Sequence, residues 1–169
     1  MNTEILHDRH LDLLLRFEAE NRNWFESLIA SRGSEFYSRE AVMAHIDQCR
    51  SLYAKNGLLP IVIVERGEII ARANLKNVCM SSRSAEVGYR VAQSHTGSGV
   101  GTYCLSELIR VSQLRYGRLM LRAKVLENNP ASRRILEKHG FLELSCEPEF
   151  IRIGSIDLRC TTMERAACA

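Results

Sequence analysis

The sequence predicts a mixed α+β domain whose sheet is largely antiparallel and contains one parallel crossover. Helical patterns fill the chain up to Gly57, and strand patterns begin at residue 58. A helical pattern then separates two strand patterns at 85–91 and 118–125, which is the order of a parallel crossover. No linker, internal repeat or low-complexity segment interrupts the chain, so we expect a single domain over residues 1–169.

Two helices are expected first. Residues 8–20 carry apolar side chains at helical spacing, at Leu11, Leu14, Leu15 and Phe17. Ser38 is suited to cap a second helix that ends at Gly57. The apolar face of that helix would consist of Val42, Ile46, Cys49 and Tyr53.

Strands follow. Residues 58–65 and 69–78 flank an Arg-Gly pair and predict a hairpin, and 85–91 predicts the next strand. Arg72, Asn74 and Lys76 alternate along the second hairpin strand. This alternation is typical of a solvated strand face, and the alternative is a surface that meets an acidic acceptor.

The second half of the chain contains two helices with clear end signals. The first follows Gly97, Gly99 and Gly101 and runs to about Gly117, and a strand is expected at 118–125. The second helix has Asn129 as N-cap, Pro130 at its first position and Gly140 at C′. Strands are expected over 141–147, 150–153 and 156–165, with a turn at Gly154-Ser155.

Composition narrows the possible functions. A net charge of +3 without a block of basic residues gives no reason to expect nucleic acid as a partner. No apolar run approaches the roughly 18 residues of a membrane span, and no signal-peptide core is visible at the N-terminus. The 6 cysteines show no metal-ligand spacing, so we expect reduced thiols, no metal and a cytoplasmic location.

The stretch "HTGSGVGTYCLSELI", residues 95–109, raises the possibility of a phosphate site. It fails the P-loop pattern because no Lys follows Gly101, and it fails the dinucleotide pattern because Thr102 occupies the last glycine position. The remaining interpretation is a set of backbone N–H groups that opens a helix and can hold a pyrophosphate. The alternative is a glycine turn that only packs the helix on the sheet.

Together with "NPASRRILEKHGF" (129–141), this loop resembles the GNAT acetyltransferase superfamily. The family loop R/Q-x-x-G-x-G/A maps to Thr96, Gly99 and Gly101, so Thr96 replaces the usual Arg or Gln. With "EVGYRV" (86–91) and "AENRNWF" (19–25), the chain looks most like the RimJ/RimL group of ribosomal-protein N-terminal acetyltransferases.

The resemblance implies a GNAT-like fold in which the strands at 85–91 and 118–125 splay apart around the pantetheine arm of acetyl-CoA. It implies no metal. The backbone of Tyr89 and Val91 would contact the arm, and the Val91 amide would donate to the thioester carbonyl. The implied pyrophosphate contacts are Thr96, Gly97, Ser98, Gly99, Val100, Gly101 and Thr102, and Asn129 would bind the arm.

The resemblance also suggests catalytic groups. Leu136 stands where many GNAT enzymes have a catalytic Tyr, so Ser132 is the candidate general acid and Glu86 the candidate base. The alternatives are a Ser132 that serves only its local backbone and a Glu86 that is only an exposed strand residue. Trp24 and Phe25 are expected either as walls of the acceptor site or as core anchors.

The expected reaction is acetyl transfer from acetyl-CoA to a primary amine, with a protein N-terminus as acceptor. At pH 7 roughly 10–17% of an α-amine is neutral, against about 0.04% of a lysine side chain. A small-molecule amine (an amino acid, polyamine or antibiotic) is the first alternative, and a CoA-binding module without activity is the second. The sequence leaves the oligomeric state open.

Overall fold

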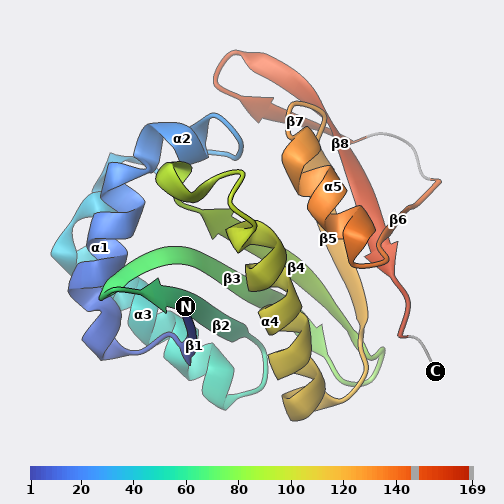
Figure 1. Ribbon diagram of the computed structural model, residues 1–169, viewed down its shortest axis with the longest axis horizontal. Helices are drawn as coiled ribbons and strands as arrows, with labels where there is room; N and C mark the ends of the chain where they lie inside the picture. Colours follow the sequence, from blue (N-terminus) through green and yellow to red (C-terminus); the bar gives the residue numbers. More distant parts are fainter. Residues whose placement is uncertain (146–148, 168–169) are drawn as a thin grey trace.

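The computed structural model describes residues 1–145 and 149–167. Within these residues an 8-stranded sheet has the order β1-β2-β3-β4-β5-β8-β6, with β7 paired to β8 (Figure 1). Only β4 and β5 pair in parallel among the described strands, so the predicted α+β architecture is confirmed. The strands are β1 (Asn2–Ile5), β2 (Leu59–Glu65), β3 (Glu68–Cys79), β4 (Ser84–Val91), β5 (Met120–Leu126), β6 (Leu142–Glu143), β7 (Glu149–Ile153) and β8 (Ile156–Arg165).

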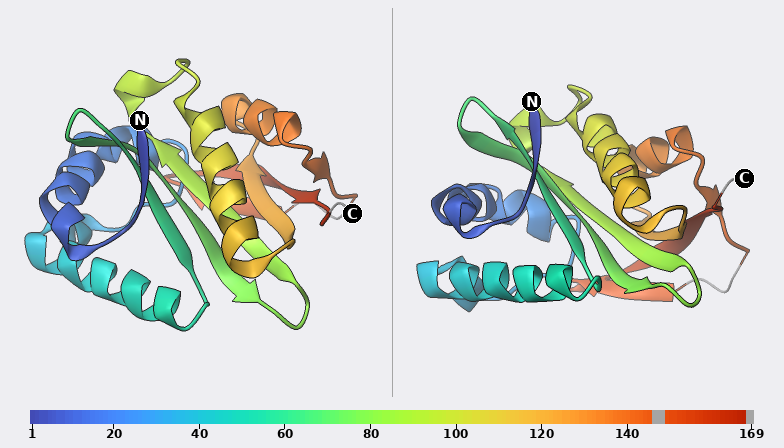
Figure 2. Two further views of the ribbon diagram at one scale, coloured as in Figure 1. Left: turned by 60° about the horizontal axis from the view of Figure 1, so that its bottom comes forward. Right: turned by 90° about the horizontal axis from the view of Figure 1, so that it is seen from below.

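Helices cover both faces of the sheet, with α1 and α3 on one face and α4 and α5 on the other (Figure 2). Short 3₁₀ helices occupy Asp8–His10, Ser34–Tyr37 and Gln93–His95. The α-helices are α1 (Leu11–Glu20), α2 (Arg22–Glu26), α3 (Arg39–Ala54), α4 (Val100–Tyr116) and α5 (Pro130–Lys138).

Two apolar cores result from this layering. Ile61 and Ile63 of β2 pack in the core beneath α4, whereas Val62 packs with α1 and α3 on the opposite face. Because β2 is buried on both faces, its sequence is a continuous apolar run and not an alternating one. The two cores therefore hold the central strands between two helical layers.

Local end signals act as expected. The Ser38 side chain accepts a hydrogen bond from the Ala41 amide at 3.2 Å and caps α3. Arg66 and Gly67 both have positive φ, as a tight hairpin turn between β2 and β3 requires. At the end of α5, Gly140 lies at C′ with φ 77°, and the Phe141 amide bonds the Leu136 carbonyl at 3.1 Å.

Several elements differ from the expectation. β1 and α2 were not anticipated, and the helix expected over 8–20 begins with a 3₁₀ turn before α1. The strand expected over 141–147 is confined to Leu142–Glu143 among the described residues, and positions 146–147 lie outside them. These elements are short, and tertiary contacts outweigh their weak local preference.

Candidate active site

β4 and β5 separate part of the way along their length. Their parallel pairing covers only Ser84–Val87 against Met120–Ala123, although β4 continues to Val91 and β5 to Leu126. On its other side β4 stays paired with β3, and the Ala92 amide donates to the Ile70 carbonyl at 2.9 Å. A gap therefore opens between the ends of the two parallel strands.

The backbone of β4 presents polar groups to this gap. The N–H and C=O groups of successive strand residues point alternately to the two sides of the strand. Since the Ala92 N–H points to β3, every second residue before it points the same way. The N–H groups of Tyr89 and Val91 consequently point away from β3 and toward the gap. The Val91 carbonyl accepts a hydrogen bond from Trp24 Nε1 at 3.3 Å, which fixes this end of β4.

The glycine loop lies at the same end of β4, and its glycines serve different purposes. Gly97 and Gly99 have φ of 76° and 86°, a conformation that L side chains rarely adopt. Gly101 lies against α5, and a Cβ there would lie 2.7 Å from Ile135 Cδ1, so a larger residue requires the Ile135 side chain to shift. The loop thus both turns the chain and lets α4 approach α5 closely.

α4 begins at Val100, so the amides of Val100, Gly101 and Thr102 have no acceptor within the helix. These N–H groups and the positive end of the helix dipole favour an anion. The loop hydroxyls do not add to them, since Thr96 Oγ1 donates to the Gln93 carbonyl at 2.8 Å and Ser98 Oγ to the His95 carbonyl at 2.7 Å. The Thr96 side chain therefore closes its own turn.

Ser132 in the first turn of α5 lies next to Tyr89 of β4. Asn129 Oδ1 accepts a hydrogen bond from the Ser132 amide at 3.0 Å, which caps the helix. Ser132 Oγ and the Tyr89 hydroxyl are 2.9 Å apart. Burial raises the pKa of Tyr89 to about 12, so its hydroxyl stays neutral at physiological pH. Leu136 is buried and takes no part in this contact.

A cleft of about 430 Å³ connects these features. Its walls come from α2 and the turn after it, the end of β4, the glycine loop, the first turn of α4, and α5 along its length. Most of the residues expected at the site line it, namely Tyr89, Val91, Thr96, Gly97, Gly99, Gly101, Thr102, Asn129 and Ser132. Ser98, Val100 and Glu86 are not in the lining.

Glu86 lies apart from the other expected catalytic residue. Its side chain is exposed on β4, and its neighbours in register are Lys76 on β3 and Arg122 on β5. Gly88 follows on the same face of the strand, with open space where a side chain would be. Glu86 and Ser132 are therefore not brought together as direct neighbours.

Sequence reasoning missed the cations of the cleft. Arg134 and Lys138 of α5 line it, as does Arg90. The signal was available, because residues four positions apart share one face of a helix. Among the described lining residues there is no Asp or Glu, so the cleft carries positive charge without a competing carboxylate.

The α2 wall of the cleft contains the aromatic pair. Trp24 and Phe25 both line the cleft, and Phe25 is also buried against Phe17, so the core role expected for it is confirmed. The Arg90 guanidinium lies 5.2 Å from the centre of the Phe25 ring. α2, which the sequence did not reveal, thus places both aromatic side chains beside the end of β4.

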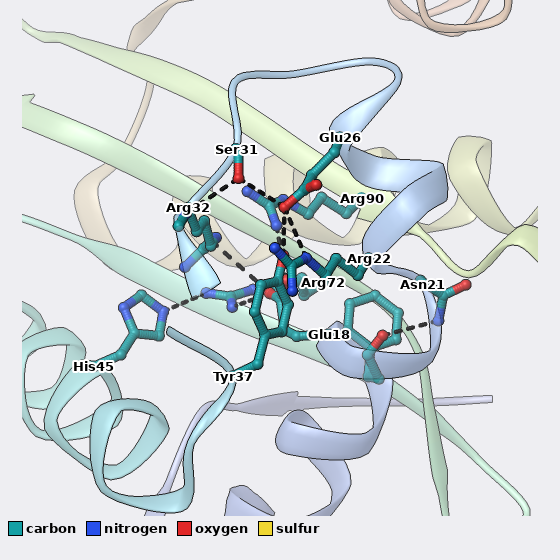
Figure 3. Close-up of polar contacts among 12 residues, drawn as sticks. Glu18, Asn21, Arg22, Glu26, Ser31, Arg32, Tyr37, His45, Arg72 and Arg90 are labelled. Atoms are coloured by element: carbon teal, nitrogen blue, oxygen red, sulfur yellow. Dashed lines mark hydrogen bonds and ion pairs between the residues drawn. The ribbon is translucent and has the colours of Figure 1, made fainter. Parts of the chain in front are cut away.

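A buried carboxylate lies behind this wall (Figure 3). Glu18 is 0% exposed and accepts hydrogen bonds from Arg72 Nη1 at 2.8 Å and Arg90 Nη1 at 2.7 Å. Burial by itself would raise the pKa of Glu18, but the charges of Arg72, Arg90 and Arg32 together hold it below its usual value. The expectation of a solvated face is therefore wrong for Arg72, which is 2% exposed.

His45 completes the cluster in a neutral form. Its Nε2 accepts a hydrogen bond from Arg72 Nη2 at 2.9 Å. Burial and the neighbouring Arg72 charge lower the pKa of His45 to about 3. His45 therefore adds no positive charge to the group.

A second hollow of about 440 Å³ lies between α1 and the start of β3 and shares only His95 with the cleft. It does not reach the gap between β4 and β5. Within residues 1–145 and 149–167, no helix has the length and apolar character needed to cross a membrane. The same residues contain no cluster of three or more His, Cys, Asp or Glu that could hold a metal ion.

Comparison with known proteins places this geometry in a family. A family model described as "Acetyltransferase (GNAT) domain" matches residues 6–142. A ribosomal-protein-serine acetyltransferase of Escherichia coli (strain K12) is 24% identical over 153 residues, which cover 85% of this chain and 81% of that protein.

Two solved structures have the same fold. A ribosomal-protein-S5-alanine acetyltransferase from Vibrio fischeri has a TM-score of 0.89 at 16% identity. The superposition covers 96% of this chain and 91% of the Vibrio fischeri chain. RimL, a ribosomal L7/L12 α-N-protein acetyltransferase in complex with coenzyme A, has a TM-score of 0.86 at 16% identity, with coverage of 96% and 92%.

Proposed function

The chain belongs to the GNAT acetyltransferase family, and we propose that it transfers an acetyl group from acetyl-CoA to the α-amine of a protein N-terminus. The observation that carries the proposal is the gap at the end of β4. One cleft joins a free Val91 N–H, the amides that open α4, and the Ser132 hydroxyl. The activity is that of an acyl-CoA-dependent transferase; the acceptor and the residue roles are the proposed part.

In this proposal acetyl-CoA is bound by its phosphates and its thioester. The amides of Gly101 and Thr102, supported by Arg134 and Lys138 across the cleft, hold the phosphates. The Val91 N–H donates to the thioester carbonyl and stabilises the negative charge that develops there. Acetyl-CoA supplies the activated acetyl group, and the protein supplies its orientation.

Ser132 is the proposed proton donor to the departing thiolate. Its hydroxyl faces the cleft, and its position is fixed on one side by the Asn129 cap and on the other by Tyr89. The Tyr89 hydroxyl has one proton, which either Ser132 Oγ at 2.9 Å or the Ser132 carbonyl at 3.3 Å can accept. When Tyr89 donates to Ser132 Oγ, the Ser132 proton is left for the thiolate. Leu136 stands where many GNAT enzymes have a catalytic Tyr, and its buried side chain has no hydroxyl. In this proposal Tyr89 on β4 supplies a hydroxyl next to Ser132 instead.

Glu86 is the proposed base and acts through water. It lies on the face of β4 that also carries Arg90, and the open space at Gly88 allows water to connect the two positions. No carboxylate lines the cleft itself among the described residues. An α-amine suits such a remote base, because a substantial fraction of it is neutral at pH 7.

The names of two relatives support this acceptor. The Escherichia coli relative is named for a ribosomal-protein serine, and the RimL structure for a ribosomal α-N-protein acetyltransferase. A small-molecule amine remains the second candidate, because the Trp24 and Phe25 wall suits a compact apolar group as well as a peptide. A cytoplasmic location fits the proposed acceptor.

Two measurements test the proposal. Acetyl-CoA at about 100 times its Kd should stabilise the folded protein by roughly 2.7 kcal/mol. Thiol release should then be followed with N-terminal peptides, amino acids, polyamines and lysine side-chain peptides. Turnover that is fastest with N-terminal peptides supports the proposal, and exclusive turnover of small amines overturns the acceptor.

The residue roles have their own variants. Ser132→Ala and Glu86→Gln should each lower kcat by about 10²–10⁴-fold with little change in the acetyl-CoA Kd, the range for a general acid or base. Arg122→Gln is the matched control for Glu86→Gln, since it removes the charge next to Glu86 in register. Wild-type kcat in either catalytic variant would refute the role assigned to that residue.

A further inference from the structure

The buried charge cluster behind the Trp24 and Phe25 wall is not electrically balanced. Glu18 is shared by three guanidinium groups, with Arg72 and Arg90 hydrogen-bonded to it and Arg32 Nη2 at 3.9 Å. His45 is neutral, so one negative charge faces three positive charges. The surplus of positive charge lies in a part of the molecule where water is largely excluded.

The other carboxylate in Figure 3 does not supply the missing charge. Glu26 Oε1 accepts hydrogen bonds from Arg22 at 3.1 Å, Ser31 at 2.7 Å and Tyr37 at 3.3 Å. Glu26 and Arg22 form an ion pair of their own. The surplus at Glu18 is therefore left for a ligand.

Arg90 is the member of the cluster that reaches the cleft. It lines the cleft beside Trp24 and Phe25, and its side chain is 16% exposed. Among the described residues its side chain makes one hydrogen bond, from Nη1 to Glu18 Oε2. A guanidinium has five N–H donors, so the others can bind an anion in the cleft. Burial lowers the pKa of Arg90 to about 10, and a bound anion would relieve that cost.

The position of Arg90 limits where the anion can be on the acceptor. Adjacent strand side chains point to opposite faces, so the place of the Arg90 guanidinium follows from its contacts and not from its position next to Val91. The guanidinium lies 5.2 Å from the centre of the Phe25 ring, and the neighbouring Trp24 donates a hydrogen bond to the Val91 carbonyl. The amine must approach the acetyl group near Val91. A group bound by Arg90 therefore lies in the same cleft as the amine, so one acceptor can carry both.

We propose that Arg90 selects acceptors that carry a carboxylate close to the reacting amine. Two kinds of amine present this chemistry: a peptide that begins with an acidic residue, and a free amino acid through its own carboxylate. A guanidinium and a carboxylate match in geometry and charge, and Glu18 holds the guanidinium in place. This inference rests on the proposed acetyl transfer to an amine.

The test compares acceptors that differ only in charge. Peptides beginning with Asp and with Asn are nearly identical in shape, and thiol release is measured for both with wild-type protein. We expect kcat/KM to favour the Asp peptide by at least about tenfold, mainly through KM, the effect of a hydrogen bond to a charged group. Alanine against alaninamide forms the second pair and distinguishes the free amino acid from the acidic peptide.

Arg90→Gln should bring the Asp-to-Asn ratio close to one. Glu18 keeps Arg72 as a partner in this variant, and stabilisation by acetyl-CoA checks that the fold and the cofactor end of the cleft are intact. Arg134→Gln is the matched control, since it removes a cleft arginine at the phosphate end. It should raise KM for acetyl-CoA and leave the Asp-to-Asn ratio unchanged.

The outcomes separate this inference from the proposed function. Turnover of amines with no preference in either wild-type pair overturns the inference alone, and this comparison needs no variant. A preference that survives Arg90→Gln overturns it as well. Absence of turnover with every amine would defeat the proposed function and with it this inference.

Discussion

Replacing Glu18 by Gln tests how far the wall of the cleft formed by Trp24, Phe25 and Arg90 depends on one buried charge. The substitution keeps the size and shape of the side chain and removes its negative charge. Glu18 is 0% exposed, and both of its oxygens accept hydrogen bonds from guanidinium groups. Arg72, at 2% exposure, would be left buried beside two other arginines without a compensating carboxylate.

We expect Glu18→Gln to lower the free energy of unfolding strongly, although the side chain keeps its shape. Removing one partner of a buried ion pair costs about 3–5 kcal/mol, because the remaining charge stays desolvated. For a chain of this size about 1 kcal/mol corresponds to roughly 2–4 °C in Tm, so Tm should fall by roughly 6–20 °C. Thermal and urea unfolding of purified wild type and variant at pH 7 measure it.

The control is an ion pair at the surface. Asp157 accepts hydrogen bonds from Arg152 at 2.8 and 2.7 Å, but both side chains are exposed. Asp157→Asn should leave unfolding unchanged within error, since exposed pairs contribute little. If Glu18→Gln shifts Tm no more than Asp157→Asn does, the cluster does not hold the wall and our assignment of its charges is wrong.

The stability difference between wild type and Glu18→Gln should also depend on pH. The pKa of Glu18 is below its usual value of 4.5 in the folded protein. A lowered carboxyl pKa adds stability that is fully present above pH 4.5 and disappears as pH falls through the folded pKa. The stability difference between wild type and Glu18→Gln should therefore be constant near neutral pH and shrink below pH 4.5.

Three further predictions follow from single contacts. Gly101→Val should destabilise the protein by about 1–3 kcal/mol, because even a Cβ would lie 2.7 Å from Ile135 Cδ1; urea unfolding measures this, and an undiminished midpoint would contradict it. Asn129→Ala should cost about 1 kcal/mol through loss of the 3.0 Å cap on the Ser132 amide, whereas Asn129→Asp keeps the acceptor and should unfold like wild type; equal losses in both would exclude the cap as the cause. The pKa of His45 is lowered to about 3, so the unfolded chain binds a proton there that the folded protein does not, and stability should decline as pH falls from about 6.5 toward 3. His45→Gln should flatten that slope in unfolding measurements at pH 7 and pH 5, and an NMR titration showing a protonated His45 at pH 5 would disprove the assignment.

Features that depend on neighbouring residues were predictable from the sequence. The Asn129 cap, the Gly140 helix end and the Arg66-Gly67 turn depend on backbone geometry and on hydrogen bonds within a few residues. The period of the apolar pattern located α1, α3 and the central strands. The glycine loop at residues 97–101 was predicted to hold a pyrophosphate from the same kind of signal, because glycine spacing at a helix start is a local property.

The contacts that define the candidate site could not be predicted from the local sequence. Glu18 meets Arg72 and Arg90 across 54 and 72 residues of chain, and Trp24 reaches Val91 across 67. Alternation along β3 made Arg72 look like part of a solvated face, because a pattern of charge cannot show what packs against it. α2, only five residues long, carries too little periodicity to be recognised.

The sequence by itself determined the order of the elements, their ends and the family motifs, since each of these results from short-range backbone preferences and periodic burial. Only the tertiary structure decided that Tyr89 would lie beside Ser132, that Ile135 packs against Gly101, and that Arg90 lies in the cleft with surplus positive charge behind it. These results depend on which side chains the packed layers bring within a few ångströms, and distance along the chain carries no information about that.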